Sequence, residues 1–146
     1  MASRLTALGL LLVLAGCGGE GSLGGSLSDV YDLSFETVRA RLFPSDLAIE
    51  FVNAKEEVVV RLTVKRALKE PHASETVDLA SEGDVTGTSG GVGIPRIARG
   101  TLTLTAWMPN AGAQVIGRFE AVFASGSAEY DLHGDFSTTL EIVPPK

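Results

Sequence analysis

Residues 57–65 read Glu-Val-Val-Val-Arg-Leu-Thr-Val-Lys, and this stretch decides the fold class of the chain. Side chains of an extended chain point alternately to its two faces, so residues two apart share a face. Most residues here are β-branched, as expected of a half-buried strand, and only Val59 breaks the alternation. The stretch therefore predicts a strand with one apolar face, made of Val58, Val60, Leu62 and Val64.

The same period of two continues upstream. Apolar residues hold the odd positions in 31–35 and the even positions in 38–42. Because a shift of one residue moves every side chain to the other face, a bulge or break is expected near Glu36 and Thr37. A further strand is predicted at 47–51. No stretch shows a convincing helical period, although 67–80 leaves room for one short helix that Pro71 interrupts.

The C-terminal third predicts three more strands, at 100–108, 114–124 and 129–143, with turn-forming sequences between them. Gly117-x-Phe119 recurs as Gly134-x-Phe136, which suits two antiparallel strands that share a core face. A short strand is possible at 76–80. Residues 81–93 are rich in Gly, Ser, Thr and Asp, and we predict a long mobile loop there.

Together these patterns predict an all-β fold in one domain at 29–146. The expected architecture is an antiparallel β-sandwich or small barrel of about seven to nine strands. Large apolar residues at the inward strand positions are expected to form its core. They are Tyr31, Leu33, Phe35, Ile49, Phe51, Val58, Val60, Leu62, Val64, Leu102, Leu104, Phe119, Phe123, Leu132, Phe136 and Leu140.

The N-terminus has the layout of an export signal. Arg4 precedes an apolar stretch at 5–13, which is well short of the roughly 20 residues that a spanning helix needs. The stretch ends in Leu14-Ala15-Gly16-Cys17, which resembles the lipobox of bacterial lipoproteins. The resemblance implies a signal peptide at 1–16, cleavage after Gly16, and a diacylglycerol on the sulfur of Cys17. The alternative is an ordinary secretory signal in which the cysteine is incidental.

The resemblance also implies a location in the cell envelope. Gly18, rather than Asp, follows the cysteine, which favours the outer membrane of a Gram-negative bacterium. Residues 17–28 are rich in Gly and Ser and predict a flexible linker that leaves the orientation of the domain free. The domain beyond the linker is similar to small uncharacterised all-β lipoproteins, which carry no assigned activity.

Charge and cysteine content narrow the possible partners. The chain has 12 basic and 18 acidic residues, a net charge of −6, so it repels the phosphate backbone of nucleic acids. Membrane attachment must then come from the lipid. Cys17 is the only cysteine, so no thiol remains for a disulfide or a nucleophile.

One motif matches a catalytic pattern. Gly87-Thr88-Ser89-Gly90-Gly91 fits G-x-S-x-G, the nucleophile turn of α/β-hydrolases. That turn needs a strand, a turn and a helix in a mostly parallel sheet, whereas the flanks here predict a loop and antiparallel strands. We therefore predict a protein that is not an enzyme and that uses no cofactor.

Asp131, His133 and Asp135 alternate with apolar residues and so share one strand face. Carboxylates and imidazoles are zinc ligands, but residues two apart on a strand lie about 6–7 Å from one another. A metal would therefore need a ligand from a neighbouring strand. The alternative is the solvent-facing side of an amphipathic strand.

Thr101, Thr103 and Thr105 also line one strand face, which ends near Trp107. A threonine row beside an aromatic ring can contact a sugar or a flat surface. The alternative is that the threonines reflect strand propensity and that Trp107 lies at the edge of the core.

These observations predict a lipid-anchored envelope protein that acts as a non-catalytic binding or scaffolding module. Its expected partners are the membrane, through the lipid, and an envelope protein or a glycan. The alternative function is a small hydrolase that uses Ser89 or a metal-dependent enzyme that uses His133.

Overall fold

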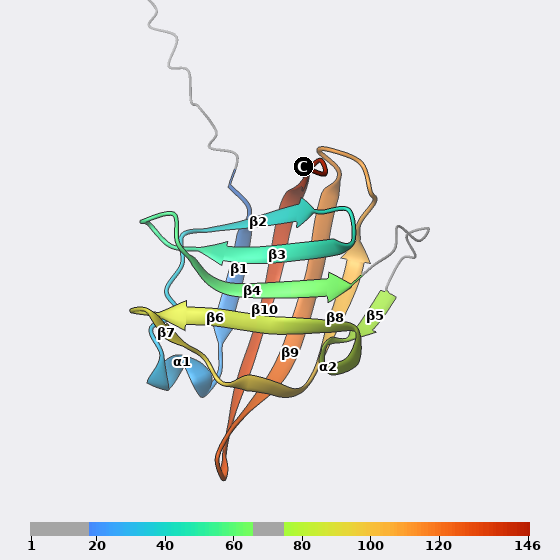
Figure 1. Ribbon diagram of the computed structural model, residues 1–146. Coiled ribbons are helices and arrows are strands. Elements are labelled where there is room, and N and C mark those ends of the chain that lie inside the picture. The colour runs from blue at the N-terminus through green and yellow to red at the C-terminus, as the bar shows by residue number, and fades with distance from the viewer. Residues whose placement is uncertain (1–17, 66–74) are drawn as a thin grey trace, which may run out of the picture.

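A computed structural model describes residues 18–65 and 75–146. Within these residues ten strands form one mixed sheet, curled around a single core (Figure 1). Along the sheet the order is β5-β8-β9-β10-β2-β3-β4-β6-β7, and β1 pairs with β10 beside this path. The strands are β1 (Glu20–Gly24), β2 (Thr37–Leu42), β3 (Asp46–Val52), β4 (Val58–Lys65), β5 (Glu75–Asp78), β6 (Gly83–Ser89), β7 (Val92–Gly93), β8 (Arg96–Ala106), β9 (Gln114–Ser125) and β10 (Ala128–Ile142). The helices are α1 (Leu27–Val30) and α2 (Leu79–Glu82).

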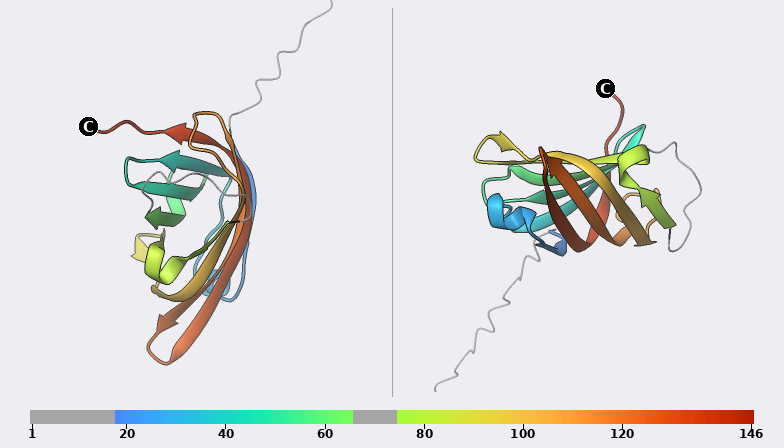
Figure 2. Two further views of the ribbon diagram at one scale, coloured as in Figure 1. Left: turned by 90° about the vertical axis from the view of Figure 1, so that its right-hand side faces the viewer. Right: turned by 90° about the horizontal axis from the view of Figure 1, so that it is seen from below.

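The curled sheet has two layers that face one another (Figure 2). β2, β3, β4 and β6 make one layer, and β1, β8, β9 and β10 make the other, with the strands of the two layers running across each other (Figure 1). Near its C-terminal end, β10 leaves β9 and pairs in parallel with β2, with Leu140 opposite Ala40 and Ile142 opposite Leu42. β10 therefore joins the two layers.

The core lies between the layers and is built by the period-two pattern. From Val115 to Phe123 in β9 and from Leu132 to Leu140 in β10, every second residue is buried, including Phe119, Phe123 and Phe136. Phe51 of β3 meets Phe119 of β9 across the layers, with ring centroids 6.1 Å apart. Of the predicted core, only Tyr31, Phe35 and Val58 are half-buried rather than buried.

The all-β fold is confirmed, with corrections. The pairing is not purely antiparallel, because β10 and β2 run parallel. The alternation at 31–35 does not mark a strand, because the connection from α1 to β2 covers these residues and β2 begins only at Thr37. The stretch predicted as a mobile loop at 81–93 instead forms β6, which pairs with β4, and the hairpin to β7. Small and polar residues there suit an outer strand as well as a loop.

The flexible linker predicted at 17–28 is the larger error. Gly19 pairs with Val38, and β1 continues along β10 from Glu20 opposite Ser137 to Gly24 opposite His133. α1 follows directly, with Leu27 fully buried. Glycines permit this close approach: a Cβ on Gly21 would lie 3.1 Å from Val38 and 3.3 Å from Phe51. The folded domain therefore begins at least ten residues earlier than predicted, within two residues of Cys17.

One buried charge lies on the outer side of the β2–β3–β4 layer. Glu50 of β3 has no exposed side-chain surface, and its carboxylate accepts hydrogen bonds from Arg39 and, at 2.6 Å, from Arg61. Arg41 lies 3.6 Å away. Burial raises the pKa of this carboxyl, but the hydrogen bonds from Arg39 and Arg61 outweigh it and hold the pKa below its ordinary value.

Candidate functional site

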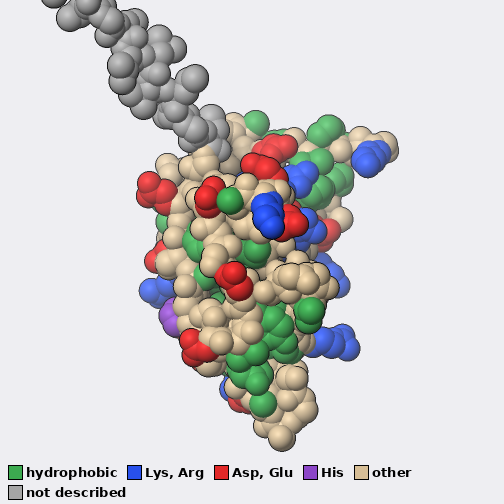
Figure 3. Space-filling view, turned by 90° about the vertical axis from the view of Figure 1, so that its left-hand side faces the viewer, with side chains coloured by type: hydrophobic (Ala, Val, Ile, Leu, Met, Phe, Trp, Pro, Cys, Tyr) green, Lys and Arg blue, Asp and Glu red, His purple; other side chains and the backbone are tan. Residues whose placement is uncertain are grey.

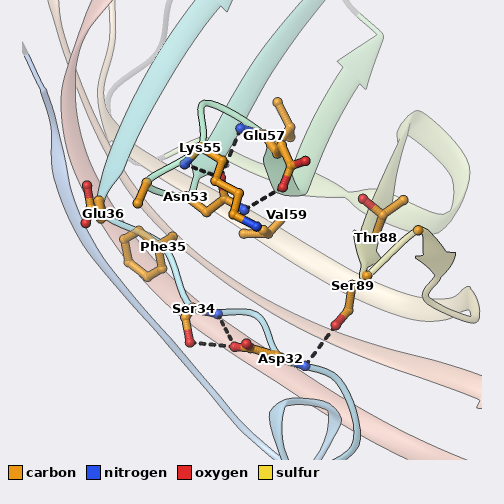
Figure 4. A pocket seen from close by; sticks show the side chains of 14 residues that line it. Asp32, Ser34, Phe35, Glu36, Asn53, Lys55, Glu57, Val59, Thr88 and Ser89 are labelled. Atoms are coloured by element: carbon orange, nitrogen blue, oxygen red, sulfur yellow. Dashed lines mark hydrogen bonds between the residues drawn. The ribbon is translucent and has the colours of Figure 1, made fainter.

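A cavity of about 760 Å³ opens at the end of the fold where three connections meet (Figure 4). The segment between α1 and β2 forms one wall, the β3–β4 turn a second, and the β6–β7 turn the third. Phe35, Val58 and Val59 supply apolar surface. The polar side chains in the lining are Asp32, Ser34, Glu36, Asn53, Lys55, Glu57, Thr88 and Ser89.

The first wall is ordered by the side chain of Asp32. Its carboxylate accepts hydrogen bonds from the Ser34 hydroxyl at 2.5 Å and from the Ser34 backbone N–H at 3.1 Å (Figure 4). These two bonds, the side-chain bond first, lower the pKa of Asp32 below its ordinary value. Asp32 therefore presents a negative charge to the cavity mouth at neutral pH.

The second wall is ordered by Asn53. Its side-chain oxygen accepts from the backbone N–H groups of Lys55 and Glu57, at 2.9 and 3.0 Å, and its amide donates to the Glu57 carboxylate at 3.0 Å. Glu56, at the apex, has a positive φ of 63°, a conformation that few non-glycine residues adopt. The turn therefore holds its polar groups in one arrangement beside Val59 (Figure 4).

Ser89, the predicted nucleophile, lies in the third wall. Its hydroxyl oxygen accepts a hydrogen bond from the backbone N–H of Asp32 at 3.1 Å, which ties the third wall to the first (Figure 4). Within the described residues no histidine or carboxylate accepts a proton from this hydroxyl. A serine nucleophile needs such a base within hydrogen-bond reach. His72 lies outside the described residues.

The predicted metal residues lie on the outer face of the β8–β9–β10 layer, away from this cavity. Asp131 and His133 line a shallow hollow of about 700 Å³, together with Thr101 and Arg99. The carboxylate of Asp131 is 3.6 Å from His133 Nδ1 and also accepts from the backbone N–H and the hydroxyl of Ser26, at 3.2 and 2.7 Å. Those Ser26 bonds, the hydroxyl first, lower the pKa of Asp131.

Asp135 lies farther along β10, at the level of Arg118 of β9, and does not line this hollow. Among residues 18–65 and 75–146, no three His, Cys, Asp or Glu side chains are placed to hold a metal ion. The Asp131–His133–Asp135 face is therefore a solvent-facing strand surface in which two of the three predicted ligands are close.

The predicted threonine row is present without its aromatic partner. Thr101 and Thr105 are exposed and Thr103 is half-buried, alternating with the buried Leu102 and Leu104. Trp107 is only 5% exposed and belongs to the core cluster, as the interpretation that it lies at the edge of the core predicted.

Sequence reasoning missed most of the cavity. Asp32, Asn53 and Lys55 belong to connections, where no period marks a functional residue. The one available signal was the sequence Asn53-Ala54-Lys55-Glu56-Glu57 between two strong strands, which is typical of a tight turn that carries exposed polar groups. The lipobox residues Leu14, Ala15, Gly16 and Cys17 lie outside the described residues.

Comparison with known proteins adds no identification. No family model, no curated protein and no solved structure matches this chain. Neither helix in the described part of the chain has the length and apolar character needed to cross a membrane.

Proposed function

We propose that this protein is an exported envelope protein, held at the membrane by lipid on Cys17, that binds a ligand without transforming it. The observation that carries the binding role is the 760 Å³ cavity, whose three walls are fixed by hydrogen bonds among their own side chains and backbone. A concave site with some apolar surface and a few placed polar groups is the usual form of a small-molecule site.

The lining favours an envelope glycan as the ligand. Sugars present hydroxyl groups beside apolar C–H surfaces. Asp32 and Glu57 offer carboxylate acceptors, Lys55 offers a donor, and Phe35 and Val59 offer apolar surface. In our proposal the glycan lies across the β3–β4 turn with its hydroxyls toward these acceptors.

The arrangement of Ser89 supports binding over hydrolysis. Its oxygen already accepts the Asp32 N–H, so the side chain acts as a link between two walls. A panel of esterase, lipase and peptidase substrates tests the alternative. Turnover by the wild-type protein that disappears in Ser89→Ala or His133→Ala would overturn the non-catalytic proposal.

The anchor is tested by labelling cells with a palmitate analogue. The wild-type protein should take up the label, and Cys17→Ser should abolish labelling and release the protein from membranes. An unlabelled wild-type protein, or a mature N-terminus other than Cys17, would refute the anchor.

Glycan binding is tested by titration calorimetry with soluble peptidoglycan fragments and with lipopolysaccharide core oligosaccharide. Lys55→Ala and Thr88→Val each remove a lining group whose side chain makes no hydrogen bond within residues 18–65 and 75–146. Both should weaken binding, whereas Thr105→Val, outside the cavity, should not. Absence of binding by the wild type, or equal binding by all variants, would refute the glycan proposal.

A further inference from the structure

The distance between the proposed lipid and the folded domain is short. Gly19 already pairs with Val38, and Glu20 pairs with Ser137 of β10. Three residue steps from Cys17 to Glu20 span at most about 11 Å, even fully extended. A domain attached this closely cannot turn freely above a bilayer, so part of its surface near Glu20 must meet the lipid.

The outer face of the β8–β9–β10 layer changes character along its length. Next to Glu20 lies an uncharged surface, in which Ser137 pairs with Ile116 and Thr139 pairs with Gln114. We define this uncharged surface as Thr105, Gln114, Ile116, Ser137 and Thr139, together with Met108, which follows the end of β8 at Ala106. The exposed carboxylates of Glu20, opposite Ser137, and of Glu141, two residues beyond Thr139, border it. No charged residue occurs anywhere from Thr105 to Ile116 in a chain that is 21% charged.

The other half of the same face is charged. It begins at the row of Asp135 and Arg118 and continues through His133 and Glu120 to Asp131. The change from uncharged to charged side chains occurs between two successive outward-facing residues of β9, Ile116 and Arg118. The charged half lies farther from Glu20 than the uncharged half does, since β1 starts at the level of Ser137.

Two apolar side chains project from the uncharged surface. Met108 is 54% exposed and Ile116 is 37% exposed. Side-chain hydrogen bonds connect its strands, from Gln114 to the Ser137 hydroxyl at 3.0 Å and from the Thr105 hydroxyl to the Ile116 carbonyl at 3.2 Å. Figure 3 shows the molecule edge-on to this face, with both hydrophobic and acidic side chains along its upper edge. The surface is therefore preformed and partly apolar.

We propose that the uncharged surface rests on the bilayer that holds the lipid of Cys17, with Met108 and Ile116 in the interfacial layer. Apolar side chains gain free energy when they enter the boundary between headgroups and acyl chains. The inference depends on the proposed anchor and adds a fixed orientation to it.

The experiment uses the lipidated protein, purified from membranes and reconstituted in phosphatidylethanolamine and phosphatidylglycerol vesicles. Cys17 is the only cysteine, so lipid on its sulfur leaves an introduced cysteine as the only thiol for a bimane label. Met108→Cys reports from the uncharged surface, and Ser127→Cys, in the β9–β10 turn, is the matched control. Lipids brominated in their acyl chains should quench the Met108→Cys label and leave the Ser127→Cys label bright.

Two further variants test whether the short connection to Cys17 and the apolar surface cause the orientation. Insertion of a long Gly/Ser segment between Cys17 and Gly18, or Ile116→Asp, should reduce quenching at Met108→Cys without releasing the protein from the vesicles. Equal quenching of the Met108→Cys and Ser127→Cys labels on protein that floats with the vesicles would overturn the orientation. Protein that carries no lipid and does not float would refute the proposed anchor instead, and with it the inference.

Discussion

Gly117 of β9 lies directly opposite Phe136 of β10, and the phenyl ring of Phe136 fills the space above the glycine. A Cβ on Gly117 would lie 2.7 Å from the ring and 2.7 Å from the backbone oxygen of Thr103. Gly134 and Phe119 repeat the relationship in the same pair of strands. Each phenylalanine thus packs over the glycine of the neighbouring strand.

Gly117→Ala should therefore destabilise the domain. The added methyl group must displace both a buried ring and a backbone carbonyl, and overpacking of this kind costs about 1–3 kcal/mol. Urea unfolding followed by tryptophan fluorescence measures the change. Gly93→Ala is the control, because its Cβ has only the Gly87 carbonyl within reach, at 3.9 Å. Equal stability of the two variants would contradict this account of the Gly117 packing.

The ion pairs of Glu50 predict an acid-sensitive contribution to stability. The pKa of Glu50 is lowered in the folded protein, so the folded state binds its proton less readily than the unfolded state does. The contribution is present above the ordinary glutamate pKa of about 4.3, and it is lost as the pH falls through the lower folded value. Unfolding free energies measured from neutral pH down to this range should decrease.

Glu50→Gln separates this contribution from those of other carboxylates. The variant should be less stable at neutral pH by about 1–2 kcal/mol, a modest loss because Arg39 and Arg61 are partly solvated. Its deficit relative to the wild type should shrink at acidic pH. A deficit that stays constant between neutral and acidic pH would argue against the ion pairs as its source.

Ser26 sets the titration of Asp131. Its hydroxyl and backbone N–H both donate to the Asp131 carboxylate and keep its pKa low. Ser26→Ala removes the larger of these effects, so the carboxyl of Asp131 should titrate at higher pH than in the wild type. Carbon-detected NMR titration of the side-chain carboxyl measures the shift. Asp135, whose carboxylate accepts no hydrogen bond within residues 18–65 and 75–146, serves as the internal reference.

The pairing of β1 predicts slow amide exchange near the N-terminus. Residues 20–24 should exchange more slowly than the turn at 125–127, because β1 is hydrogen-bonded to β10 along its whole length. Hydrogen exchange followed by mass spectrometry compares the two segments. Exchange of 20–24 at the rate of an unstructured chain would restore the flexible-linker prediction.

The sequence predicted the strands better than their connections. Alternation in 57–65 and in the three C-terminal strands follows from which side chains are buried, and that information is local. The linker prediction failed because β1 is stabilised by a partner more than a hundred residues away, and its glycines serve close packing on Val38 and Phe51. Composition alone cannot distinguish that use of glycine from flexibility.

The site was less accessible to sequence reasoning. Ser89 was found through a motif, yet its place in the cavity depends on Asp32, a residue 57 positions away. His133 and Thr101 fall in one hollow because β9 separates their strands, with Glu120 paired to both. The order of strands in the sheet decides which side chains come together in a site, and a period-two pattern does not determine that order.

β10 is shared by the two layers of the sheet, and this limits when the protein can complete its folding during synthesis. β10 pairs with β1, β9 and β2, and all three come before it in the chain. Every nascent chain that stops short of β10 therefore exposes unpaired strand edges from both halves of the protein, which is a hazard for aggregation. Chaperones that shield extended segments are expected to matter until synthesis has passed Ile142, and truncations within the last strand should accumulate as insoluble material.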